Sequence, residues 1–194
     1  MTREELLALI DQTAEESWKE LDLSGKKLTE LPGEIGKLTQ LETLILGKWE
    51  REKKGSQGRE GFEYVEGKWV PLVSGNQLKS LPPELANLNN LCMLDLSGNH
   101  FEEFPDVVAQ LPALEQLTLT WGELKELPKT IGQLTNLTTL HLFENQLTQV
   151  PEAIGQLTNL TTLHLSNNQL TQVPEAIGQL TNLSALHLSA LLKE

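Results

Sequence analysis

The sequence predicts an α/β solenoid, in which successive coils contribute parallel strands to a concave sheet and short helical turns to the convex side. The first observation is a unit, LxxLxLxxNxLxxLPxxIxxLxx, that recurs with a period of 23 residues. The second is that 41 of the 194 residues are leucine, far more than an ordinary globular chain contains. The third is that the last two leucines of LxxLxL are separated by one residue, as on a strand with one buried face.

The repeats divide the chain into two predicted segments. Residues 1–17 precede the first repeat, and residues 18–194 hold six full repeats and a truncated seventh. The repeat starts are 23 residues apart except between the second and the third, where the distance is 50 residues. An insertion of 27 residues, at about 47–74, therefore lies within the second repeat. The repeats begin at Trp18, Leu41, Leu91, Leu114, Leu137, Leu160 and Leu183.

Residues 1–17 are predicted to form a helix that caps the first coil. Thr2 and Glu5 have the spacing of a capping box, which begins a helix by satisfying free backbone N–H groups. Leu6, Leu9 and Ile10 share one helical face. Because an end coil exposes part of the core, this face is expected to cover it.

Each position of the repeat has a structural interpretation. Leucines such as Leu140 and Leu142 point inward from the strands. The asparagine that follows can both donate to and accept from backbone groups that the turn leaves unpaired. The proline of LPxxI suits the first position of a helical turn, where no N–H group is needed. The predicted asparagine ladder consists of Asn76, Asn99, Asn145 and Asn168.

Three repeats lack this asparagine. Lys26, Gly122 and Leu191 stand at the asparagine position of repeats one, four and seven. At Gly122 the missing side chain predicts an altered turn beside Trp121.

The insertion is predicted to contain a β-hairpin at the rim of the concave face. Its strands are expected at Phe62–Val65 and Lys68–Val70, joined by a turn at Glu66 and Gly67. Two arrangements of its aromatic side chains remain open. They form a lid over the concave surface, or they pack onto repeats two and three and serve only the core. The aromatic side chains concerned are Trp49, Phe62, Tyr64 and Trp69.

The seventh strand, expected at Ala185–Ser189, is predicted to be an open edge. Leu186 and Leu188 point inward but have no further coil over them. Exposed strand edges pair with other strands, so self-association through this edge is one expectation. The other two are that Leu191 and Leu192 fold back as a cover, or that the chain is a fragment of a longer protein.

The repeat unit resembles that of the leucine-rich repeat family, and the resemblance covers nearly the whole chain. The segments LPGEIGKL, LPKTIGQL and VPEAIGQL are similar to the 23-residue LPxxIGxL type. The N-terminal segment MTREELLALIDQTAEESWKELDLSGKKLTELP resembles the start of bacterial, specifically cyanobacterial, Roco proteins. This resemblance implies the N-terminal recognition part of a larger GTPase, whose nucleotide-binding domain this sequence does not contain.

Charge and cysteine content exclude several classes of function. The formal net charge is −12, and residues 130–192 contain no Lys or Arg, so a surface that follows nucleic-acid phosphates is not expected. No run of 18 apolar residues suggests a membrane span, and the N-terminus lacks the apolar region of a secretory signal. With Cys92 as its single cysteine, the chain is expected to be cytoplasmic.

No catalytic motif is found, so the sequence predicts a protein that is not an enzyme and needs no cofactor. It contains no phosphate-binding loop GxxxxGK[ST], no HExxH, no CxxC and no GxSxG. Cys92 has no neighbouring His motif and is interpreted as a packing residue.

His141, His164 and His187 occupy one position in three successive repeats and should form a column on the concave sheet. A metal site is not favoured, because no acidic or thiol ligand accompanies all three. A surface whose charge changes with pH is the milder interpretation.

The predicted function is the binding of a protein or peptide partner on the concave face. Repeats five and six agree at 21 of 23 positions and differ only at Phe143/Ser166 and Glu144/Asn167, where a binding surface would diversify. Trp121 and Phe143 are expected to be exposed anchors, or else to pack on each other. An architectural segment that self-associates through its C-terminal edge is the alternative function. The candidate binding residues are Met93, Asp95, Thr118, Trp121, His141, Phe143, Glu144, His164 and Asn167.

Overall fold

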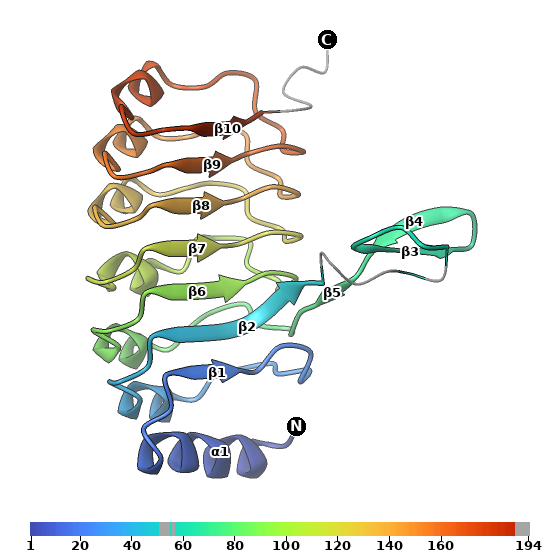
Figure 1. Ribbon diagram of the computed structural model, residues 1–194, viewed down its shortest axis with the longest axis vertical. Helices are drawn as coiled ribbons and strands as arrows, with labels where there is room; N and C mark the ends of the chain where they lie inside the picture. The colour runs from blue at the N-terminus through green and yellow to red at the C-terminus, as the bar shows by residue number, and fades with distance from the viewer. Residues whose placement is uncertain (51–54, 56, 189–194) are drawn as a thin grey trace.

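The computed structural model describes residues 1–50, 55 and 57–188, and residues 51–54, 56 and 189–194 lie outside this description. The coils are stacked on one another, with the strands aligned and the short helical turns forming a second column beside them (Figure 1). The predicted α/β solenoid is confirmed. None of the helices in the described residues is long and apolar enough to cross a lipid bilayer.

The strands of the repeats form a parallel sheet in sequence order. Within the described residues this sheet has eight strands, one of which, β5 (Val73–Ser74), pairs antiparallel with β2. The parallel strands are β1 (Glu20–Asp22), β2 (Thr43–Trp49), β6 (Met93–Leu96), β7 (Gln116–Thr118), β8 (Thr139–His141), β9 (Thr162–His164) and β10 (Ala185–His187).

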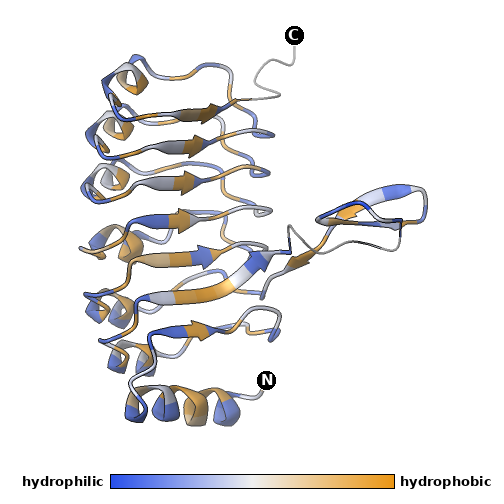
Figure 2. Ribbon diagram, viewed as in Figure 1, coloured by the Kyte–Doolittle hydropathy of each residue, from blue (hydrophilic) through white to orange (hydrophobic). Residues whose placement is uncertain are grey.

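The repeat period places equivalent leucines in register. Leu94, Leu117, Leu140 and Leu163 pair along neighbouring strands, and all four are fully buried. Apolar positions consequently recur at the same place in successive coils (Figure 2). Burial of a leucine side chain contributes roughly 1.5–3 kcal/mol, so this column is a major source of stability.

Each LPxxI segment forms one 3-10 turn, as predicted. The proline stands one residue earlier than expected, immediately before the turn, where its carbonyl accepts the first hydrogen bond; Ile35 N–H donates to Pro32 O at 3.1 Å. The turns are η1 (Gly33–Lys37), η2 (Pro83–Asn87), η3 (Asp106–Gln110), η4 (Lys129–Gln133), η5 (Glu152–Gln156) and η6 (Glu175–Gln179).

The asparagine ladder is confirmed, and each amide joins two coils. Asn145 Nδ2 donates to Leu119 O of the preceding coil at 2.7 Å and to Leu142 O of its own coil at 3.1 Å. Its Oδ1 accepts from Leu124 N–H at 3.1 Å. Asn76, Asn99 and Asn168 make the same type of bridge.

The turn at Gly122 is not altered, so that prediction is wrong. Trp121 has a φ of 55°, which matches 57° at Glu144 and 56° at Asn167, the equivalent residues of the next two repeats. The backbone keeps its course because Gly122 N–H donates to Glu144 O at 3.0 Å. A Cβ atom at Gly122 would lie 2.9 Å from Asn145 Oδ1, so the turn has little room for a side chain there.

The N-terminal helix α1 (Arg3–Glu15) begins with the predicted capping box. Thr2 Oγ1 accepts from Glu5 N–H at 3.2 Å, and Glu5 Oε2 accepts from Thr2 N–H at 2.7 Å. Leu6 and Ile10 are buried and belong to the same core as the repeats.

The insertion contains the predicted hairpin, which we call the arm (described residues 57–74). Strands β3 (Phe62–Val65) and β4 (Lys68–Pro71) are antiparallel, and φ values of 47° at Glu66 and 85° at Gly67 form the tight turn between them. The hairpin projects away from the stack of coils, and β5 returns the chain to the sheet beside β2 (Figure 1).

The last coil is less covered than the others. Leu186 on β10 is 39% exposed, whereas the equivalent Leu163 is fully buried. Self-association at this edge stays a prediction, and Ser189, Leu191 and Leu192 lie outside the described residues.

Candidate functional site

The concave face holds a pocket of about 460 Å³ whose floor is made by equivalent residues of successive strands. In-register pairing places Asp95, Thr118, His141, His164 and His187 side by side on β6 to β10. These residues follow one another because the position between the two buried leucines of LxxLxL always faces the open side of the sheet. Ser97, Thr120, Phe143, Thr162 and Trp49 complete the lining.

Trp49 joins an aromatic cluster that limits the pocket on one side. Its ring centroid lies 5.9 Å from that of Trp121 and 5.4 Å from that of Phe143. Phe62 of the arm lies 6.0 Å from both Trp49 and Trp121. Most of these pairs are edge-to-face, which is a favourable geometry for aromatic rings. The root of the arm is thereby attached to repeats four and five.

The four aromatic residues of the insertion were predicted either to form a lid over the concave surface or to pack onto repeats two and three. As a group they do neither. Trp49 and Phe62 pack onto repeats four and five rather than two and three. Tyr64 and Trp69 pair with each other at 5.1 Å and remain 43% and 41% exposed on the hairpin. The physical reason is that β2 extends beyond the parallel sheet, so that Trp49 at its end lies against Trp121 of repeat four and Phe143 of repeat five.

The expectation that Phe143 is an exposed anchor is wrong. Its exposure is 8%, because Trp49 covers one side of the ring and His164 stacks on it at 4.5 Å. Trp121 is half-buried, and its Nε1 atom is buried without a hydrogen-bond partner. The mutual packing of Trp121 and Phe143, at 6.0 Å, is the arrangement found.

Asp95 is the acidic group of the pocket. Its Oδ1 atom accepts from Ser97 N–H at 2.9 Å and from Ser97 Oγ at 2.6 Å, and Ser97 Oγ also contacts Thr120 Oγ1 at 2.8 Å. Burial raises the pKa of the Asp95 carboxyl to about 6, although the hydrogen bonds from Ser97 act in the opposite direction. The neighbouring Asp22 raises this pKa further, and Lys48 lowers it.

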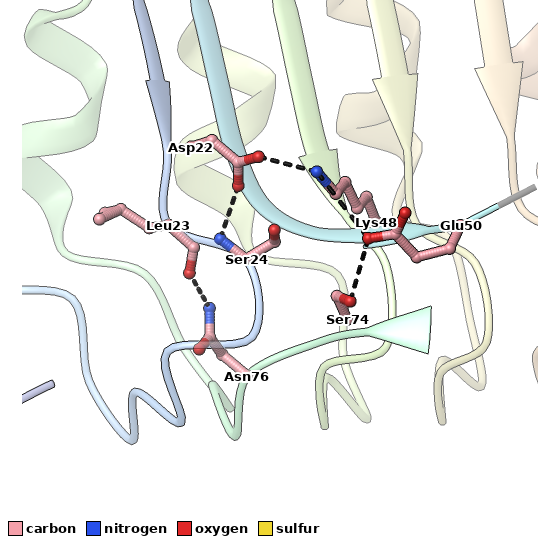
Figure 3. Close-up of polar contacts among 7 residues, drawn as sticks. All are labelled: Asp22, Leu23, Ser24, Lys48, Glu50, Ser74 and Asn76. Atoms are coloured by element: carbon pink, nitrogen blue, oxygen red, sulfur yellow. Dashed lines mark hydrogen bonds and ion pairs between the residues drawn. The ribbon is translucent and has the colours of Figure 1, made fainter. Parts of the chain in front are cut away.

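Lys48, a basic group that acts on Asp95 electrostatically, is already engaged by other carboxylates (Figure 3). Lys48 Nζ lies 2.9 Å from Asp22 Oδ2 and 3.9 Å from Glu50 Oε1. The hydrogen bond with Asp22 raises the pKa of Lys48. Burial alone would raise the pKa of Asp22, but hydrogen bonds from Ser24 and Lys48 outweigh it and lower that pKa.

Asp95→Asn is expected to stabilise the fold at neutral pH. Because its folded-state pKa of about 6 lies above the ordinary 3.8, ionised Asp95 reduces stability, and this loss develops as the pH rises from about 4 to about 6. One pKa unit corresponds to about 1.4 kcal/mol, so the shift of about two units sets an upper limit of about 3 kcal/mol, and we expect a gain of about 1–3 kcal/mol above pH 7.

Urea denaturation of both proteins at pH 7.5 and at pH 4 measures this gain. The difference between variant and parent should shrink at pH 4, where folded Asp95 is protonated and the unfolded-state carboxyl is about half protonated. A variant that is less stable than the parent at pH 7.5 would contradict the electrostatic account of Asp95.

The three imidazoles form the predicted column. The ring centroids of His141 and His164 are 5.9 Å apart at 90°, and those of His164 and His187 are 4.7 Å apart at 43°. In the described part of the chain, no three His, Cys, Asp or Glu side chains are grouped to hold a metal ion. The rings contact one another and Phe143 instead.

The structure brings some of the predicted binding residues together and separates others. Asp95, Thr118, His141, Phe143 and His164 line the pocket. Met93, Trp121, Glu144 and Asn167 are not part of its lining. Trp121 and Glu144 line a shallow depression at the root of the arm, and Asn167 Nδ2 donates to Glu144 Oε1 at 2.6 Å.

The sequence-based binding set did not include Ser97, Thr120, Thr162 and His187, which also line the pocket. Ser97 and Thr120 occupy the same repeat position as Phe143, directly after the second buried leucine. That shared position was the signal that could have found them.

Comparison with known proteins agrees with the repeat geometry. The family model described as "Leucine-rich repeat region" matches residues 113–194, and the one described as "Leucine rich repeat" matches residues 72–124. The chain is a leucine-rich-repeat solenoid. A search of curated proteins gives no match.

Several solved leucine-rich-repeat structures resemble this one. The structure described as a TDR receptor is 29% identical, with a TM-score of 0.62, and the match covers 84% of this chain and 24% of the receptor. PEPR1, in the PEPR1–AtPEP1 structure, is 25% identical, with a TM-score of 0.54 over 82% of this chain and 23% of that one.

The ectodomain of the plant membrane receptor kinase GASSHO1/SCHENGEN3 from Arabidopsis thaliana is a third similar structure. It is 24% identical, with a TM-score of 0.57, and was crystallised in complex with CASPARIAN STRIP INTEGRITY FACTOR 2. The match covers 88% of this chain and 24% of the ectodomain. The leucine-rich-repeat chain described here thus spans about a quarter of the length of these three proteins.

Proposed function

We propose that this solenoid binds a protein or peptide on its concave face, in the pocket between Trp49 and the histidine column. The observation that carries this proposal is the pocket itself. The concave sheet alone is open, and Trp49, which packs on repeats four and five, gives it a side wall there. Aromatic faces, hydroxyl groups and one half-buried acid line it, which is the mixture that recognition sites use.

The similar structures support a binding role rather than catalysis. PEPR1 and GASSHO1/SCHENGEN3 were solved with AtPEP1 and CASPARIAN STRIP INTEGRITY FACTOR 2, respectively. The finer assignment, a cytoplasmic recognition domain of a bacterial Roco-like GTPase, rests on the LPxxIGxL segments and on residues 1–32, and it stays a prediction.

The proposal is tested by peptide-display selection on the wild-type protein, followed by affinity measurement on two variants. Thr118→Trp places a bulky ring in the pocket, because Thr118 lines it from the middle of the sheet. Thr158→Trp is the matched control, since Thr158 is exposed outside the sheet, just after η5.

We expect the selected peptides to bind Thr118→Trp at least about tenfold more weakly, a loss of about 1.4 kcal/mol, and to bind Thr158→Trp like the wild type. Circular dichroism and thermal unfolding should show both variants folded. Equal binding to Thr118→Trp would place the site elsewhere, and a selection that yields no binder would count against the function.

A further inference from the structure

The acidic side chain of the pocket, Asp95, has no counter-ion in the described part of the chain. Among the described residues, no basic side chain forms an ion pair with Asp95. Lys48, the cation that acts on it electrostatically, is held by Asp22 and Glu50 instead. The two hydrogen bonds recorded for the Asp95 carboxylate both reach Oδ1. A half-buried carboxylate without a counter-ion is costly, and a bound cation would offset that cost.

The remaining lining suits the rest of a basic side chain. Trp49 offers aromatic surface against which the alkyl part of a lysine or arginine can pack and over which its charged end is attracted. Thr118 and Thr162 place hydroxyl groups on the floor, and hydroxyl oxygens accept hydrogen bonds from ammonium and guanidinium groups. The same chemistry already occurs in the arm, where the guanidinium of Arg59 lies 4.2 Å from the Phe62 ring centroid.

Among the residues that the structure describes, the charge around the pocket opposes an acidic ligand. Asp22 on β1 and Glu50 after β2 lie on the Asp95 side, with Lys48 between them, and residues 130–192 contribute no Lys or Arg. The groups that face the pocket from the other side are the imidazoles of His141, His164 and His187 on β8, β9 and β10.

We propose, on the basis of the peptide-binding function above, that this pocket takes a lysine or arginine side chain of the partner, with Asp95 as its counter-ion. Binding should weaken on acidification, because Asp95 then loses its negative charge.

Capped synthetic nonapeptide pools test this proposal on the full chain. The pools are randomised except at the central residue, which is fixed as Lys, Arg, norleucine or Glu; norleucine keeps the alkyl chain of lysine and removes its charge. Acetylated and amidated ends remove the terminal charges, and one norleucine pool with a free N-terminus distinguishes a terminal ammonium from a side chain. Retention on immobilised protein is measured at pH 8 and pH 5.

Three variants accompany the wild type. Asp95→Asn removes the proposed counter-ion, and its fold is checked by thermal unfolding. Asp106→Asn is the matched control. It changes the net charge by the same amount, but Asp106 is an exposed residue of η3, away from the sheet. Thr118→Trp blocks the pocket and reports whether retained peptides use the concave face.

We expect the Lys and Arg pools to be retained about tenfold better than the capped norleucine pool at pH 8, with little preference at pH 5. Asp95→Asn should abolish the preference and Asp106→Asn should preserve it. A preference that survives in Asp95→Asn, or one shown only by the free N-terminus, would overturn the proposal.

The two levels of the proposal fail in different ways. Pools that are retained alike whatever their central residue, but lost on Thr118→Trp, would leave the binding function standing and remove the cation site. Pools that are retained equally by wild type and Thr118→Trp would remove the concave binding function as well.

Discussion

Phe143→Ala should lower the free energy of unfolding by about 3–5 kcal/mol, the range for truncation of a buried phenylalanine. The ring is 8% exposed and contacts Trp49, Trp121 and His164, so its removal opens a cavity where the arm meets the sheet. Guanidinium denaturation measures the change. Tryptophan emission should also shift to the red, because Trp49 and Trp121 become more accessible to water.

The matched control is Ser166→Ala in repeat six, where the serine occupies the same position in a nearly identical repeat and is buried to 4% exposure. Removal of this hydroxyl opens no comparable cavity, so we expect a change below about 1 kcal/mol. If Phe143→Ala and Ser166→Ala cost the same, the aromatic cluster does not stabilise the fold.

Asn145→Ala should cost about 3 kcal/mol or more, because one substitution leaves two buried backbone groups unpaired. Leu119 O loses its donor and Leu124 N–H loses its acceptor, whereas Leu142 O keeps the hydrogen bond from Asn168 Nδ2 at 2.9 Å. An unsatisfied buried group costs about 1–3 kcal/mol, and water has little access since Asn145 is 8% exposed. Urea denaturation, monitored by circular dichroism, gives the value.

Asn136→Ala is the control for this variant. Asn136 is exposed and makes one hydrogen bond, from Nδ2 to Pro112 O at 2.8 Å, so its removal should cost no more than about 1 kcal/mol. A loss at Asn145 that is no larger than the loss at Asn136 would show that the inner ladder is not a main source of cohesion between coils.

The regular part of the molecule could be predicted because each structural role recurs every 23 residues. A buried strand leucine, a turn asparagine and a proline before the helical turn each have one physical explanation, and that explanation applies to every coil. The hairpin turn could also be predicted from the sequence, since Glu66 and Gly67 stand where such turns require the positive φ values that both residues adopt. A second row of asparagines escaped notice although it is just as periodic. It consists of Asn90, Asn136, Asn159 and Asn182, each of which donates to a carbonyl of the preceding coil.

The aromatic cluster could not be predicted from the period, because the insertion does not follow it. The direction in which β2 continues past the sheet decides that Trp49 lies across repeats four and five, and this direction depends on the pairing of Lys48 and Trp49 with β5. The burial of Phe143 and the side wall of the pocket both depend on this contact. The floor of the pocket was foreseen, since it is made by one position of the repeat.

The attachment of the arm also affects how the molecule responds to force. In a repeat array each coil contacts its neighbours only, so the array extends like a uniform spring. Here the rings of Trp49 and Phe62 connect coil two with Trp121 of coil four, and Trp49 also reaches Phe143 of coil five. Coils two to five cannot be pulled apart unless these rings separate, whereas coils six and seven have no such fastening in the described residues. Under tension, coils six and seven should therefore separate at a lower force than coils two to five.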